Sequence, residues 1–358
     1  MKNYFSKMLL CFMVAGLFIA LNGNVAYAAE RINISYDDPN LEYMWEIDRN
    51  SLHTFGTDPE TGDTIRKPIQ NFSQVKGTNT FFLTQHYNKD TYLYRCTLNS
   101  VGKIKANDYV KLSNYGHGES VEVTDYNPST GVYTIWLGTT AGNTSDYWSL
   151  NISRVKYKAD NVSATGARII EHKDITNIHR VAGVGGNANR TSVSIAEDDD
   201  RICFCSQINN NNGNWYYIVY SFSEVDAALN KKGTTTTLSG LGVGYKSVFS
   251  MTDSGLPNAS FQAIDIDGVG SNNKMLFLSG GKHTNNGQIN QYLYTNGGNI
   301  TKMYEYVIRN TVADPDDFLY NAEIEGIKIY PANGRDYIYI LFKKYKATYG
   351  QIYRYPVR

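Results

Sequence analysis

A short pattern recurs along the chain and constrains its fold more than any other feature of the sequence. Each copy is a polar residue followed by apolar residues two and four positions later. The clear copies begin at Glu119, Thr191, Gln262 and Glu325, and a weaker copy begins at Gln70. Because self-similarity at a spacing of tens of residues marks a repeat architecture, the copies predict five structural units.

Each copy is followed by further segments that alternate between polar and apolar residues. The copy at Glu119 continues into "VYTIWLG" and "YWSLNISRVKY", and the copy at Gln262 continues into "KMLFLSG" and "INQYLYTN". These segments are rich in Tyr, Ile and Val, and Gly, Asn, Asp and Pro separate them, as is typical of antiparallel strands joined by turns. Segments such as "YVKLSNY" and "MYEYVIRN" supply a fourth strand per unit.

Repeated four-stranded units predict an all-β fold, a β-propeller with five blades around a central channel. We expect residues 29–358 to form one such domain, with "MWEIDRN" closing the ring as the outer strand of the last blade and "SEVDAALNKKG" forming a short helix between blades. A long two-sheet sandwich is the alternative, because irregular strand spacing alone does not distinguish the two. In a propeller, four apolar residues of the pattern should be buried between blades: Val121, Val193, Ile264 and Ile327.

The N-terminus has the features of a secretory signal peptide. Lys2 and Lys7 precede an uncharged run over residues 8–21, and Ala26-Tyr27-Ala28 has the small-x-small form of a cleavage site. We therefore expect residues 1–28 to be a signal peptide, cleaved after Ala28, and the protein to be secreted. A retained anchor is the alternative, although the run is shorter than the ~20 residues that span a bilayer.

Composition argues against several partner classes. Without Lys2 and Lys7 the chain has 32 basic and 34 acidic residues, so its net charge of −2 attracts neither nucleic acid nor anionic lipid. We expect no transmembrane segment in the mature chain.

Cys203 and Cys205 would face one side of a strand as small hydrophobic residues, and a disulfide from either to Cys96 is the alternative.

The leading residues of the five copies are the candidate site residues. Since the first strand of each blade lines the channel, these residues should meet at one mouth. Four neighbours should add to that rim: His117, Arg190, Ser260 and Glu323. The predicted ligand-binding residues are Gln70, His117, Glu119, Thr191, Gln262 and Glu325. They either form a polar cup that binds a hydroxyl-rich ligand such as a sugar, or hydrogen-bond neighbouring blades. The sequence leaves both hypotheses open.

Motifs for metals, cofactors and catalysis are missing from the sequence. Asp265-Ile266-Asp267-Gly268 with Asn272 resembles the start of a calcium loop but lacks the distal Glu, and the histidines have no zinc spacing. We expect no metal and no cofactor. No catalytic motif is found, and enzymatic activity stays open because Glu119 with Glu325 or Glu323 would suit the carboxylate pair of a glycoside hydrolase.

Several segments, in order and spacing, resemble the helveticin J family, large heat-labile bacteriocins of Gram-positive bacteria. They are "NASFQAIDIDGVGSNNKMLFLSG", "NWYYIVYSFSEVDAALNKKG", "AEIEGIKIYPANGRDYIYILFKKY" and "GQIYRYPV", and the likeness extends from about Asn79 to Arg358. The resemblance implies a secreted bacteriocin that acts on the envelope of related Gram-positive bacteria. A non-lytic propeller that binds cell-wall glycan is the alternative, and a glycoside hydrolase is another.

The resemblance brings no catalytic residue with it. The chain also departs from the family pattern, because Thr191 follows Arg190 where the pattern has an acidic residue opening the third unit. The cleavable signal is a second difference. The bacterial cell envelope or a cell-wall glycan is the partner that the resemblance implies.

Overall fold

The computed structural model describes most of the chain after the N-terminal segment. Its described residues are 28–57, 64–160, 166–198, 200–208, 213–267, 274–281, 286–309, 319, 321–344 and 350–358. The predicted signal peptide lies outside them, apart from Ala28, as do His283 and the Gly268–Asn272 part of the calcium-like segment.

The strand pairings group into five antiparallel units of four strands, each running from an inner to an outer strand. Unit 1 contains β3 (Ile69–Gln74), β4 (Thr80–Tyr87), β5 (Asp90–Leu98) and β6 (Lys103–Leu112). Unit 2 contains β7 (Val121–Asn127), β8 (Val132–Ala141), β9 (Ser149–Lys158) and β10 (Arg168–Thr176). Unit 3 contains β11 (Ala188–Ile195), β12 (Arg201–Ile208), β13 (Trp215–Ser221) and β15 (Ser247–Met251).

The remaining units include strands from the start of the described chain. Unit 4 contains β16 (Ala263–Asp267), β17 (Met275–Gly280), β18 (Gly287–Tyr294) and β19 (Ile300–Ile308), and β1 (Glu30–Ile34) pairs in parallel with β19. Unit 5 contains β20 (Ala322–Ala332), β21 (Arg335–Lys344), β22 (Gly350–Pro356) and β2 (Glu42–Ile47). In unit 2, β14 (Thr235–Thr237) adds a parallel edge to β10.

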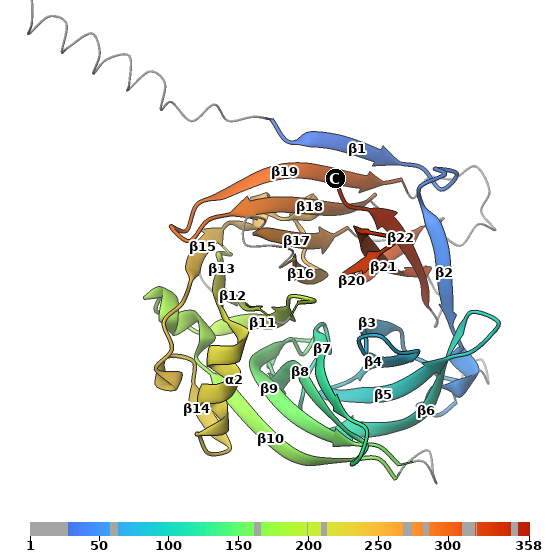
Figure 1. Cartoon of the computed structure of the whole chain (residues 1–358), viewed down its shortest axis with the longest axis horizontal. Helices are drawn as coiled ribbons and strands as arrows, with labels where there is room; N and C mark the ends of the chain where they lie inside the picture. The colour runs from blue at the N-terminus through green and yellow to red at the C-terminus, as the bar shows by residue number, and fades with distance from the viewer. Residues whose placement is uncertain are drawn as a thin grey trace, which may run out of the picture.

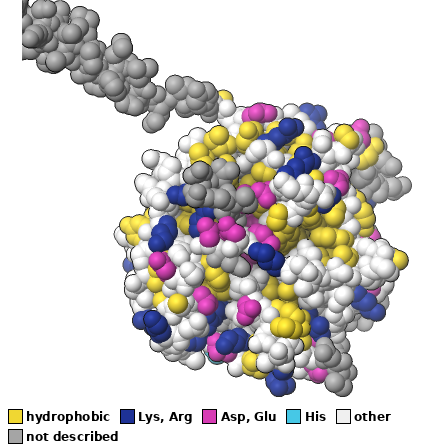
Figure 2. Space-filling model, in the orientation of Figure 1, with side chains coloured by type: hydrophobic (Ala, Val, Ile, Leu, Met, Phe, Trp, Pro, Cys, Tyr) yellow, Lys and Arg dark blue, Asp and Glu magenta, His cyan; other side chains and the backbone are white. Residues whose placement is uncertain are grey.

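The units are arranged around a central axis, as Figure 1 shows. The inner strands β3, β7, β11, β16 and β20 each contact the inner strands of neighbouring units. This radial arrangement confirms the all-β propeller prediction over the two-sheet sandwich. Acidic and basic side chains are interspersed over the face in view in Figure 2, as expected for a chain with equal numbers of both.

The N-terminal strand β2 joins the two ends of the ring. It pairs antiparallel with β22, where Trp45 lies opposite Ile352, and in parallel with β6 through the pairs Glu46–Lys103 and Ile47–Ile104. The closure predicted for "MWEIDRN" is therefore confirmed. Units 5 and 1 consequently form one continuous eight-stranded sheet.

Apolar side chains of the repeated pattern fill the space between units. The four residues predicted to be buried, Val121, Val193, Ile264 and Ile327, are at most 2% exposed. Cys203 and Cys205 belong to one buried cluster, as expected for residues two apart on a strand, and Cys96 is buried in another. All three are free cysteines, so the alternative of a disulfide is not observed.

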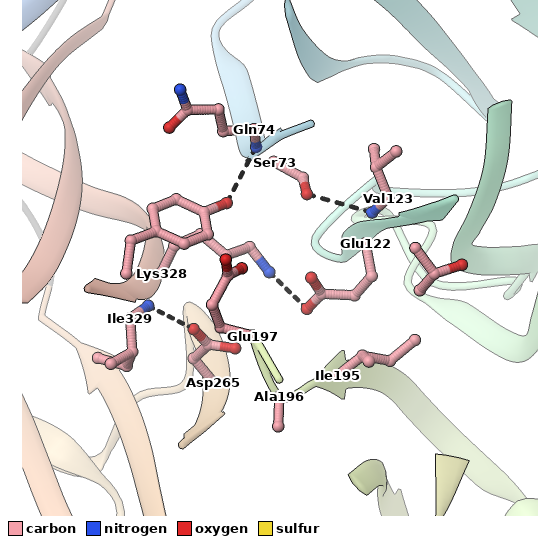
Figure 3. Close-up of a pocket in the computed structure, with 12 residues that line it drawn as sticks. Ser73, Gln74, Glu122, Val123, Ile195, Ala196, Glu197, Asp265, Lys328 and Ile329 are labelled. Carbon is pink, nitrogen blue, oxygen red and sulfur yellow. Dashed lines mark hydrogen bonds and ion pairs between the residues drawn. The ribbon is translucent and has the colours of Figure 1, made fainter. Parts of the chain in front are cut away.

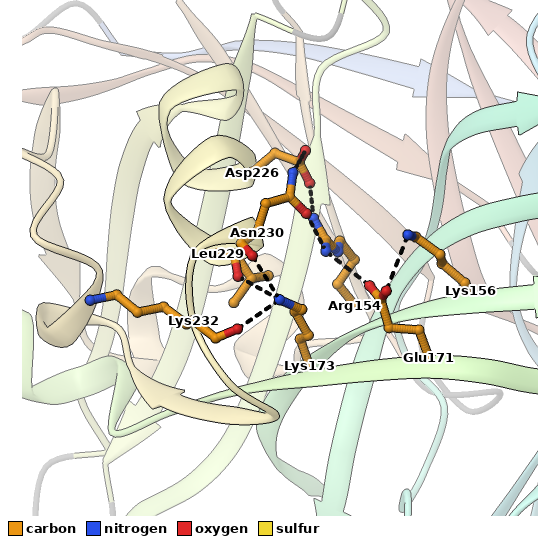
Figure 4. A network of polar contacts seen from close by, with 8 residues as sticks. All are labelled: Arg154, Lys156, Glu171, Lys173, Asp226, Leu229, Asn230 and Lys232. Atoms are coloured by element: carbon orange, nitrogen blue, oxygen red, sulfur yellow. Dashed lines mark hydrogen bonds and ion pairs between the residues drawn. The ribbon is translucent and has the colours of Figure 1, made fainter.

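The single α-helix of the described residues, α2 (Phe222–Asn230), is inserted between β13 and β15 and packs against unit 2. The carboxylate of Asp226 accepts from Arg154 Nη1 of β9 at 2.5 Å. Arg154 also bonds Asn230 of the helix (Figure 4). Lys173 of β10 donates to three carbonyl groups at the C-terminal end of the helix, which fixes it there.

Candidate ligand-binding site at the channel mouth

Polar and aromatic side chains gather where the inner strands begin. All five inner strands start at the same end of the channel, so residues at their N-terminal ends, and at the adjoining ends of the second strands, lie around one mouth. We call the following group the cup: His117, Glu119, Trp148, Arg190, Gln262, Glu323, Glu325 and Lys343.

The central contact of the cup is a buried ion pair between Glu119, which precedes β7, and Arg190 of β11. Arg190 Nε donates to Glu119 Oε1 at 2.9 Å, and the two residues are 6% and 2% exposed. Among the described residues, Glu119 Oε2 and Arg190 Nη2 are buried without a hydrogen-bond partner of good geometry, and the unpaired hydroxyl of Ser192 lies near the Glu119 carboxyl group. Since buried polar atoms are normally paired, one free acceptor and one free donor side by side suit a bound polar group.

Planar groups form a continuous stack on one side of this pair. The Arg190 guanidinium lies 3.5 Å from the ring centre of Trp148 and 4.8 Å from that of Phe261. The ring centre of His117 lies 4.0 Å from that of Trp148 with the two rings tilted by 41°, and His86 of β4 stacks on His117 with ring centres 4.5 Å apart. Trp148, His117 and His86 are partly exposed, so the stack offers ring surface to a ligand.

A second cluster of charges comes from unit 5. Lys343 Nζ lies 2.7 Å from Glu325 Oε1 and 3.4 Å from Glu323 Oε2, and Gln262 Nε2 donates to Glu323 Oε1 at 2.7 Å. Glu325 is the extra residue of a β-bulge, where the register of β20 shifts between Ile324 and Gly326. Bulges redirect side chains, and this one places Glu325 beside Lys343.

Burial shifts the pKa values of the cup residues. It raises the pKa of Glu119 to about 7, against the lowering effect of Arg190, and raises the pKa of Glu325 to about 7, against that of Lys343. Desolvation of the ring, with a smaller electrostatic effect from His86, lowers the pKa of His117 well below its usual value. At neutral pH the two carboxyl groups can therefore donate or accept hydrogen bonds, while His117 is uncharged.

The structure brings together four of the six residues predicted from the sequence: His117, Glu119, Gln262 and Glu325. Thr191 instead donates to the carbonyl of Leu150 at 3.0 Å, which ties unit 3 to unit 2, as the alternative hypothesis of inter-blade contacts expects. Gln70 is buried in a β-bulge of β3 and takes part in none of the cup contacts described above.

Sequence reasoning missed two residues of the cup. Trp148 precedes β9 and Lys343 lies on β21, so neither belongs to the repeated pattern. Arg190 and Glu323 are expected on the rim as neighbours of the leading residues, and the structure places both in the cup. No signal in the sequence connects Trp148 to Arg190, because their contact depends on how two units meet.

Further along the inner strands β7, β16 and β20 lies a buried charge network, which we call the plug: Glu122, Asp265 and Lys328 (Figure 3). Lys328 forms an ion pair with Glu122, and Asp265 accepts from the Ile329 amide at 2.6 Å and from Ser194 Oγ at 2.5 Å. Burial raises the pKa of Glu122 to about 8. The adjoining cavity of about 20 Å³ has room for roughly one water.

Within the described ranges, no group of three or more His, Cys, Asp or Glu residues could hold a metal ion. Asp265, which opens the calcium-like segment, is engaged in the plug. No helix in the same residues has the length and apolar character needed to cross a membrane.

Among the matching solved structures, a phage tail fiber has a TM-score above 0.5 and supports the fold. The tail fiber of a Staphylococcus aureus phage matches with a TM-score of 0.52 and 15% identity, over 88% of this chain and 52% of that one, so this chain spans about half of the tail fiber. The catalytic domain of a Coprinopsis cinerea α-L-arabinofuranosidase matches with a TM-score of 0.46 and 10% identity over 89% and 98% of the two chains. The β-propeller domain of Swd1 from Myceliophteria thermophila matches with a TM-score of 0.39 and 9% identity over 88% and 96%.

Comparison of sequences identifies the family. Curated proteins give no match to the chain. The family described as bacteriocin helveticin-J matches residues 57–353, which is most of the sequence and includes the whole cup. The chain therefore belongs to the helveticin-J bacteriocin family.

Proposed function

We propose that the protein is a secreted bacteriocin that acts on the envelope of related Gram-positive bacteria, and that the cup binds the envelope component it recognises. Family membership and the expected signal peptide support this role. The observation that carries the assignment of the site is the buried Glu119–Arg190 pair, which leaves one acceptor and one donor unpaired beside the partly exposed ring of Trp148.

The contacts of the cup favour binding over a purely structural role. A residue that only ties units together, such as Thr191, has a protein partner for its polar atom. Glu119 and Arg190 come from different units and already bond each other, yet each keeps an unpaired buried atom. An unpaired buried atom costs about 1–3 kcal/mol, which a ligand can recover on binding.

Three substitutions test the site: Glu119→Gln, Gln262→Ala and Glu325→Gln. We expect each substitution to abolish killing and binding to isolated cell walls. The melting temperature should stay near that of the wild type, because glutamine at position 119 or 325 keeps an oxygen that accepts from Arg190 or Lys343. When Gln262 is replaced, Glu323 keeps its contact with Lys343. Killing on a panel of related bacteria, wall cosedimentation and thermal unfolding are measured on the same samples.

Glu46→Gln is the matched control. Glu46 lies on the outer strand β2, outside the cup, and pairs with Lys103 of β6. This variant should kill and bind as the wild type does. Unchanged killing by all three cup variants would remove the cup from consideration. A parallel loss of stability and killing would instead mean that these residues join the units together.

Two other activities use the same residues. A propeller that binds wall glycan without killing would show wall binding but no growth inhibition.

A glycoside hydrolase is favoured only by the pKa of about 7 that burial gives both Glu119 and Glu325, since a general acid needs a raised pKa. Release of reducing sugar from isolated walls, lost in Glu119→Gln, would support the hydrolase over the bacteriocin.

A further inference from the structure

The chemistry of the cup defines the class of ligand that it accepts. The Glu119–Arg190 contact joins one nitrogen to one oxygen, Nε to Oε1, rather than two nitrogens to two oxygens. Arg190 Nη2 and Glu119 Oε2 are thus left as a neighbouring donor and acceptor. A hydroxyl group both donates and accepts hydrogen bonds, so two adjacent hydroxyls of one ligand would satisfy both atoms.

The charges of the cup do not favour an anionic ligand. Its two cations are already engaged, because Arg190 pairs with Glu119 and Lys343 lies between Glu323 and Glu325. With its three carboxylates ionised the cup has a net charge of −1. A phosphate group would have to displace a carboxylate from Arg190 or Lys343, whereas an uncharged ligand would leave both ion pairs in place.

The planar stack suits a ligand with an apolar ring face. Trp148 is partly exposed and contacts both the Arg190 guanidinium, 3.5 Å from its ring centre, and the tilted ring of His117. Its orientation is therefore fixed before a ligand arrives, which lowers the entropic cost of binding. The C–H face of a sugar ring packs on such an aromatic surface while its hydroxyls reach polar neighbours.

We infer that the cup, in its proposed role of binding the envelope, takes an uncharged saccharide with adjacent hydroxyl groups and does not take phosphate-bearing polymers. The hydroxyls bond Glu119 Oε2 and Arg190 Nη2, and the sugar ring packs against Trp148. This inference rests on the proposed function and adds the ligand class to it.

Two probes from the walls of one sensitive strain test the inference: the purified uncharged polysaccharide and the purified polyglycerol phosphate. We expect the full mature chain to bind the uncharged polysaccharide saturably, with an affinity that added salt does not reduce, because no charged contact is screened. It should not bind the polyglycerol phosphate. Trp148→Ala should weaken binding about tenfold, as expected for loss of an aromatic contact, and Trp148→Phe should weaken it less.

Tyr126→Ala is the matched control, because Tyr126 is an exposed aromatic residue near the opposite end of an inner strand. It should bind as the wild type does. Binding to polyglycerol phosphate alone, or to neither probe by a protein that still kills, would overturn the ligand class and leave the proposed function standing. Wild-type binding by a folded Trp148→Ala would overturn the site. A wild-type protein that neither binds walls nor kills would overturn the proposed function itself.

Discussion

Replacing Lys328 by methionine is expected to destabilise the fold by about 3–5 kcal/mol, the cost of breaking a buried ion pair from one side. Lys328 is 2% exposed and neutralises Glu122, and its charge also acts on the buried Asp265. Methionine fills similar space but leaves both carboxyl groups buried without a cation. The measurement is the free energy of unfolding in urea at about pH 9, above the folded pKa of Glu122 of about 8, so that the pair is ionised.

A surface pair provides the control for this substitution. Lys103 pairs with Glu46 at 3.0 Å, but its side chain is 48% exposed. Lys103→Met should therefore cost far less than Lys328→Met, because solvent screens an exposed ion pair. The double variant Lys328→Met with Glu122→Met should recover part of the lost stability, because it removes a carboxyl group that the single variant leaves unpaired. If Lys328→Met costs no more than Lys103→Met, the plug does not stabilise the channel.

The free energy of unfolding is also expected to fall as the pH rises from about 5 to about 8. In the folded chain, burial raises the pKa of Glu119 and Glu325 to about 7 and that of Glu122 to about 8, whereas all three ionise near 4.5 in the unfolded chain. Between these values the folded state binds more protons than the unfolded state. Stability is then greatest below about pH 4.5 and is lost as the pH rises through the folded pKa values.

The size of this pH effect follows from the pKa shifts. A rise from 4.5 to about 7 corresponds to roughly 3 kcal/mol for one group. Urea unfolding at several pH values gives the slope, and Glu119→Gln and Glu325→Gln should each flatten it between pH 5 and about 7. The cost of Lys328→Met should also be smaller at neutral and low pH, where Glu122 is protonated, than above about pH 8. A free energy of unfolding that stays constant or rises over this range would contradict the assigned pKa shifts.

The sequence predicts the fold well because the signals that specify it are local. Alternation of apolar and polar residues places Val121 and Ile264 between units, and the same alternation identifies β2 as the strand that closes the ring. The position of α2 was also predictable as an insertion. Its attachment to unit 2 through Arg154 was not, because that contact joins residues 72 positions apart.

The site is predicted less completely because its contacts depend on how units meet. The repeated pattern identified Glu119 and Glu325 by position, but it also selected Thr191, whose hydroxyl bonds Leu150 instead. A pattern of spacing gives the strand on which a residue lies and not the direction of its side chain after a bulge. Trp148 and Lys343 lie outside the pattern and become visible only in the folded chain.

The most direct test of the cup as the envelope-binding site is amide hydrogen exchange of the mature protein with and without isolated walls of a sensitive strain. Binding should slow exchange at the cup, in residues 115–120, 146–150, 188–191, 261–263 and 323–325, and leave the hairpin at residues 126–133 near the opposite end unchanged. Protection confined to that hairpin, with no change at the cup, would contradict the account.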